Sequence, residues 1–242
     1  MKKTTPTKTE QVLQLDYTNT DQPWLSSQET LRRLIGILGV MLPFLLWFFL
    51  YVDTGYKKPM ESISHYYFTR ACSIMVIVVS LLAIFLLIYK GYRPVDFWVS
   101  KIAGIFALGL VLFPTGNISI ICQDPDSVYS VTILKDSPFR VAFHYISATL
   151  FLSSLAFMSL FLFTKSNKPP EKRTRNKWIR NRIYRICGVI MILAILVIAA
   201  GLFGIIPEEI YFKNRLTFWM ETVAVESFGV AWLLKGKVGI KD

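Results

Sequence analysis

Long apolar runs alternate with short polar loops along this chain of 242 residues, and the alternation repeats six times. Each run is close to the roughly 20 residues that an α-helix needs to cross a hydrocarbon core about 30 Å thick. The pattern therefore predicts an all-α, polytopic integral membrane protein with a six-helix transmembrane bundle. The expected spans lie near residues 34–52, 71–89, 97–115, 139–163, 183–205 and 216–234.

The composition agrees with this interpretation, and the loop lengths predict the domain organisation. Hydrophobic residues make up 53% of the chain and charged residues 18%, whereas soluble domains have about 25% charged residues. Because the loops between runs are short, we expect one transmembrane domain over residues 31–236. Residues 1–30 are polar without apolar periodicity, so we expect a flexible segment there, and residues 237–242 form a short tail.

The charges sort by loop and predict an orientation. The net charge is +11. The N-terminal stretch, the second and fourth loops and the tail hold 20 Lys and Arg residues against 7 acidic ones, whereas the other three loops hold 7 of each. Basic residues stay in cytoplasmic loops of membrane proteins, so both termini are expected in the cytoplasm, and an even number of spans agrees. No eukaryotic sorting signal is evident, which favours a bacterial inner membrane, and no nucleic-acid partner is expected.

The fourth loop is the most basic part of the chain, and it leaves two interpretations open. It is either a contact site for anionic lipid headgroups, at about 1 kcal/mol per basic residue, or only a determinant of topology. Pro169 and Pro170 break the chain there, and a helix is expected to resume around Asn176. The candidate lipid contacts are Lys172, Arg173, Arg175, Lys177, Arg180 and Arg182.

Three ionisable residues lie inside the expected spans: His144, Glu221 and Glu226. A charge within hydrocarbon costs several kcal/mol unless it has a partner, so such residues are candidates for a functional site. Glu221 and Glu226 are five positions apart on one helix and therefore point about 140° apart. They cannot both face one small site.

The first outer loop brings further polar residues to the same side of the membrane: Ser62, Ser64 and His65. One interpretation is a polar pocket open to the outer leaflet, with Glu221 and His144 as partners. The other is a set of hydrogen bonds that hold the loop over the helix ends. The sequence leaves both open.

Motifs for catalysis are sparse. The chain has two histidines, and intramembrane metal hydrolases need three or more well-placed His or carboxylate ligands. No phosphate-binding loop, dinucleotide fingerprint or haem motif is present, so no cofactor is expected. A metal site from His65, His144 and either Glu221 or Asp124, or a Ser–His pair, remains as a minor hydrolase alternative. Cys72 and Cys122 both fall on the outer side and are able to pair.

Two short motifs carry a resemblance to a known family. They are Ser62-Ile63-Ser64 before the second span and His144-Tyr145-Ile146-Ser147-Ala148 at the start of the fourth. With six spans and internal termini, the chain resembles the group of the damage-regulated autophagy modulator and the FGF-receptor-activating protein, and related prokaryotic families of unknown function. The resemblance implies that Ser62, Ser64 and His144 are family-retained residues and that the protein is non-enzymatic.

Three functional hypotheses follow, in order of preference. The first is a non-enzymatic protein that binds membrane lipid or a membrane-protein partner, including a second copy of itself, through the outer pocket. The second is a proton- or ion-coupled transporter or channel with Glu221, Glu226 and His144 along its path. The third is an intramembrane hydrolase.

Overall fold

The computed structural model describes residues 28–89, 91, 94–118, 131–166 and 174–240. Within these residues the chain is helical and has no β-strand. The long helices are α2 (Gln28–Thr54), α3 (Cys72–Ile88), α4 (Pro94–Leu112), α5 (Pro138–Phe157), α6 (Arg175–Leu202) and α8 (Leu216–Lys235). The short ones are the 3-10 helix η1 (Ser64–Phe68), the π-helical turn η3 (Met158–Leu162) that continues α5, and α7 (Glu208–Lys213).

Local sequence signals set several of the helix starts. The Ser137 hydroxyl accepts a hydrogen bond from the Arg140 backbone N–H, and Pro138 occupies the first turn of α5. The Thr174 hydroxyl likewise accepts from the Lys177 N–H at 3.2 Å and begins α6. Both satisfy backbone donors that the first turn of a helix leaves unpaired. The resumption of a helix expected around Asn176 is therefore confirmed, one residue earlier.

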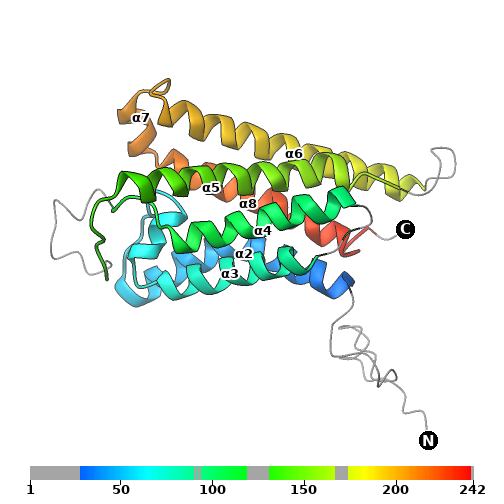
Figure 1. The fold of residues 1–242 in the computed structure, drawn as a ribbon, viewed down its shortest axis with the longest axis horizontal. Coiled ribbons are helices and arrows are strands. Elements are labelled where there is room, and N and C mark those ends of the chain that lie inside the picture. Colours follow the sequence, from blue (N-terminus) through cyan, green and yellow to red (C-terminus); the bar gives the residue numbers. More distant parts are fainter. Residues whose placement is uncertain (1–27, 90, 92–93, 119–130, 167–173, 241–242) are drawn as a thin grey trace, which may run out of the picture.

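The six long helices form a closed ring in which each contacts the next: α2, α3, α4, α5, α6, α8 and α2 again. Figure 1 shows them running lengthwise beside one another. The α2–α8 contact depends on two glycines. A Cβ added to Gly36 would lie 2.8 Å from the Gly229 carbonyl oxygen, and one added to Gly229 would lie 2.7 Å from the Val40 nitrogen. Close backbone approach at small residues is how helices associate in lipid.

Length and composition identify a membrane protein. Within the described residues, four helices are long and apolar enough to cross a bilayer: Glu29–Thr54, Pro94–Leu112, Pro138–Leu162 and Arg175–Leu202. Helix α3 is apolar but has 17 residues. The outer surface of the bundle carries large apolar side chains such as Phe44, Ile105 and Leu193, which are 49–56% exposed. Such a surface suits lipid tails rather than water.

The bundle has two chemically different ends, seen at opposite sides of Figure 1. The end that carries residues 55–71, 113–118 and 203–215 is named the loop end. The other, where α2 begins and α8 ends, is named the basic end. The expected flexible segment over residues 1–30 lies almost entirely outside the described residues.

Candidate functional site

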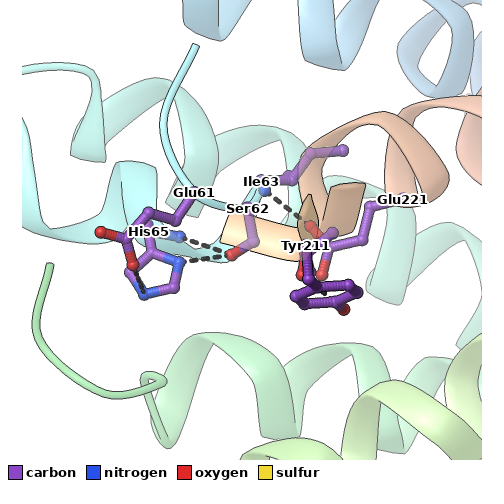
Figure 2. Close-up of polar contacts among 7 residues, drawn as sticks. Glu61, Ser62, Ile63, His65, Tyr211 and Glu221 are labelled. Atoms are coloured by element: carbon purple, nitrogen blue, oxygen red, sulfur yellow. Dashed lines mark hydrogen bonds and ion pairs between the residues drawn. The ribbon is translucent and has the colours of Figure 1, made fainter. Parts of the chain in front are cut away.

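The loop end is organised around η1, which lies over the bundle with its first turn directed inward. The Glu221 carboxylate, from the second turn of α8, accepts a hydrogen bond from the Ile63 backbone N–H at 2.6 Å (Figure 2). The backbone of Ser64 also hydrogen-bonds to this carboxylate. The first N–H groups of a helix lack partners within the helix and carry partial positive charge, so a carboxylate is well suited to them. Glu221 therefore ties the first loop to the last helix.

His144 makes the second link between η1 and the bundle. Its Nδ1 lies 2.9 Å from the Phe113 carbonyl oxygen, and its Nε2 lies 3.1 Å from the Ser64 hydroxyl. Since a carbonyl only accepts, Nδ1 carries the proton and donates to Phe113, and Nε2 accepts from Ser64. His144 is 3% exposed, so both of its ring nitrogens are satisfied inside the protein. The two motifs that suggested the family resemblance thus meet in space.

His65 forms a separate cluster on the outer face of η1 (Figure 2). Its Nδ1 lies 2.6 Å from the Ser62 hydroxyl, which also accepts from the His65 backbone N–H at 3.2 Å. Its Nε2 lies 3.5 Å from the Glu61 carboxylate. Burial, with a smaller contribution from the positive charge of Arg215, lowers the pKa of His65 to about 4. The imidazole is therefore neutral at neutral pH.

Two residues that the sequence analysis did not single out complete the loop end. Arg215 has left-handed backbone geometry (φ 50°) just before α8, and its guanidinium donates to the Tyr56 hydroxyl at 3.1 Å. The Tyr211 hydroxyl accepts from Thr217 at 2.7 Å, and burial raises the pKa of Tyr211. In the sequence, Arg215 was one of several loop basic residues and Tyr211 one of several interfacial aromatics. Neither had a pattern that could distinguish it.

A cavity lies beneath η1, within the loop-end half of the ring. Its volume is about 50 Å³, several times the roughly 10–15 Å³ that one water needs. Ser64 and Glu221 are its polar lining residues. The remaining lining is apolar and comes from the residue before η1 and from α2, α3, α4, α5 and α8: Leu42, Ile63, Met75, Val79, Leu82, Leu110, Ala148, Phe151, Leu152, Leu155, Val225 and Phe228.

Of the expected site residues, the structure gathers Ser62, Ser64, His65, His144 and Glu221 at the loop end and separates Glu226 from them. Glu226 is exposed on the outer surface of α8 and forms no hydrogen bond or ion pair with the described residues. His144 and Glu221 both bind η1 and have no direct contact in the described structure. The sequence-based interpretation of hydrogen bonds that hold the loop over the helix ends matches these contacts.

The other expected sites are treated more briefly. Among the described residues, no three His, Cys, Asp or Glu side chains lie close enough together to hold a metal ion. Cys72 is a half-buried free thiol, and Cys122 lies outside the described residues. In the fourth loop, Arg180 is buried, Lys177 is half-buried, and Arg175 and Arg182 are exposed. Lys172 and Arg173 lie outside the described residues.

Comparison with known proteins adds no relative. No family model, no curated protein and no solved structure matches this chain. The chemistry of the site is therefore inferred from the geometry of its residues. That geometry is an apolar cavity with one carboxylate and one hydroxyl at its rim, held in place by a buried histidine.

Proposed function

We propose that this protein is a six-span membrane protein, with both termini in the cytoplasm, that binds an amphipathic lipid from the outer leaflet. The ring of six long helices supports this span count, because α3 and α8 pack lengthwise between longer apolar neighbours. The loop charges support the orientation, with the basic end inside. A bacterial inner membrane and kinship with the autophagy-modulator group are parts of the same proposal. The Ser64–His144 hydrogen bond, which joins the two family-like motifs, supports the kinship.

The observation that carries the binding proposal is the composition of the loop-end cavity. Its walls are apolar, which suits a few carbons of an acyl chain, and its polar groups are confined to Ser64 and Glu221. Ligand sites commonly combine an apolar wall with a few polar groups that fix orientation. The chain would enter between the helices, and a donor on the lipid headgroup or backbone would hydrogen-bond to Glu221. This role needs no covalent chemistry.

The direct experiment fills the cavity. Ala148 lines it, and Ala142 is an exposed alanine earlier on the same helix. Wild type, Ala148→Phe and Ala142→Phe would be reconstituted in vesicles that contain a photoreactive phospholipid, and the crosslinked lipid would be mapped by mass spectrometry. Crosslinks to cavity residues in wild type and Ala142→Phe, but not in Ala148→Phe, would support the proposal. Equal labelling of all three proteins would refute it.

The transport alternative is tested in the same vesicles. It requires Glu221, Glu226 and His144 along one path, and the exposure of Glu226 on the outer surface of α8 favours lipid binding over that path. Proton flux across a pH gradient would be compared between wild type, Glu221→Gln and Glu226→Gln. Flux in wild type that both substitutions abolish would favour transport and overturn the binding proposal.

A further inference from the structure

Basic side chains from three helices converge at the basic end. Arg32 of α2 and Arg180 of α6 are 5% and 6% exposed, unusually low values for arginine. With Lys177 they lie close enough to Lys235, in the last turn of α8, to act on its charge. Asp96 of α4 is the acidic group of the described chain that acts on the same lysine. We name Arg32, Lys177, Arg180 and Lys235 the cation cluster.

Aromatic rings line the cation cluster. The Arg32 guanidinium lies 5.7 Å from the centroid of the Tyr89 ring, and the Lys235 ammonium lies 5.4 Å from that of Phe163. The Trp232 ring touches both of these rings, at centroid distances of 5.0 and 5.2 Å. Ring faces attract cations and keep water away from them, so the cluster is held in a partly desolvated setting.

A neutral donor lies within the same aromatic group. Trp232 is fully buried, and its indole N–H has no hydrogen-bond partner in the described part of the chain. An unpaired buried donor costs about 1–3 kcal/mol. It is an independent sign that this region is suited to an acceptor.

Acidic side chains also lie at this end. The Asp96 carboxylate also lies 3.9 Å from the Lys165 ammonium, and Glu29 pairs with Arg33 and Lys237, which lie outside the cluster. The cluster members have other contacts within the protein. The inference depends on the convergence of basic side chains from three helices: the Lys177 ammonium donates to the Phe163 carbonyl at 3.3 Å, and the Lys235 ammonium lies over the ring of the same residue. Such a concentration attracts an anion in a partly desolvated setting.

We propose that the cation cluster is a binding site for the phosphate group of an anionic phospholipid from the leaflet at the basic end. The site lies where α2 and α6 pass from apolar to polar sequence. Leu34 and Ile179, within one turn of Arg32 and Arg180, are each 40% exposed and are available to acyl chains. Basic pockets between spanning helices on the cytoplasmic side are known headgroup sites, and arginine suits phosphate because its N–H groups match two oxygens. This inference rests only on the membrane placement in the proposed function, not on the loop-end cavity.

The test compares two arginines of the same helix. Arg180 is buried in the cluster, and Arg185, five residues later, is exposed. Wild type, Arg180→Gln and Arg185→Gln would be purified with mixed phosphatidylglycerol and phosphatidylcholine, and retained lipid would be counted by native mass spectrometry. Wild type and Arg185→Gln should retain phosphatidylglycerol selectively, and Arg180→Gln should bind it about five- to tenfold more weakly. Equal losses in both variants would mean diffuse attraction to a basic surface and would overturn the proposal.

Two controls keep the result interpretable. Arg32→Lys keeps the charge but loses the paired N–H groups of arginine, so it should retain only part of the selectivity for phosphatidylglycerol; this variant and the wild-type selectivity test the proposal even if Arg180→Gln folds poorly. Inorganic phosphate is the second arm: if millimolar phosphate binds the lipid-free protein and displaces phosphatidylglycerol completely, the site serves a free anion and the lipid assignment is wrong. Ala148→Phe should leave phosphatidylglycerol binding intact, so failure of the loop-end proposal and of this one are distinguishable.

Discussion

At the loop end, buried polar groups form specific hydrogen-bonded pairs, whereas at the basic end cationic side chains from three helices gather near aromatic rings. Glu221 holds the backbone of Ile63, and His144 holds Ser64 and Phe113. At the other end Arg32 and Lys235 lie against Tyr89 and Phe163. The loop end thus pairs Glu221, His144 and Ser64 within the protein, and the basic end gathers positively charged side chains. The apolar cavity with its one carboxylate suits an amphipathic ligand, and gathered positive charge suits an anionic one.

Helix α8 contains the same contrast within a single element. Glu221 is held by η1 at the rim of the cavity, while Glu226, five residues later, is exposed on the outer surface without a partner among the described residues. Two identical side chains therefore have opposite expected contributions to stability. The predictions below use this contrast and that between the two ends.

The largest effect is expected from Glu221→Leu. The substitution leaves the inward-facing N–H groups at the start of η1 without their acceptor, and a lost charged hydrogen bond of this kind costs about 2–3 kcal/mol. The matched control is Glu226→Leu, which removes a carboxylate from an apolar surface and should leave stability unchanged or raise it. Thermal unfolding of both variants in the same detergent measures the difference. Equal destabilisation of the two variants would show that the hydrogen bond between Glu221 and Ile63 does not stabilise the protein.

A pH effect of about 1–3 kcal/mol is expected at the loop end. His65 has a pKa of about 4 in the folded protein against about 6.5 when unfolded, so between these values the unfolded chain binds more protons. Stability should therefore fall as the pH is lowered from about 6.5 to about 4. Hydrogen exchange of residues 60–68 at several pH values would report it. His65→Gln should flatten the dependence, and an unchanged profile in that variant would assign the effect to another group.

The Ser64–His144 hydrogen bond should give a coupling of about 1 kcal/mol in a double-mutant cycle. Ser64→Ala, His144→Gln and the double variant would be compared by unfolding in one detergent. Additive losses would indicate that the two motifs contact each other without stabilising each other.

The smallest effect on stability is expected from Lys235→Met. This change keeps the apolar stem over Phe163 and removes one of four like charges, so the lipid-free protein should be neutral or slightly more stable, within about 1 kcal/mol. Phosphatidylglycerol should stabilise the variant less than it stabilises the wild type. Melting temperatures measured with and without the lipid separate the stability of the lipid-free protein from the stabilisation by phosphatidylglycerol. A variant that is strongly destabilised without lipid would show that Lys235 stabilises the fold and not a ligand.

Much of the architecture was already determined by the sequence, because helix formation in lipid depends on the local run of apolar residues. The last expected span, 216–234, agrees closely with α8 (Leu216–Lys235), and the span 139–163 agrees with α5 and η3, which together cover residues 138–162. The start of α2 was less well predicted, because this helix begins several residues before its apolar run and hydropathy does not mark a polar first turn. Helix α6 also begins before its apolar run, but there the two prolines, and not hydropathy, indicated the start.

The sites could be predicted only as lists of residues, and the tertiary structure decided which of them meet. Ser64 and His144 are 80 positions apart, and Ile63 and Glu221 are 158 apart. Their contacts depend on the path of η1 across the ring. Arg180 and Arg182 look alike in the sequence, yet one is buried beside α8 and the other is exposed, because helix rotation is set by packing between helices. The hydrophobicity of a segment can be read from its own residues, whereas the contacts between distant polar groups depend on how all six long helices pack.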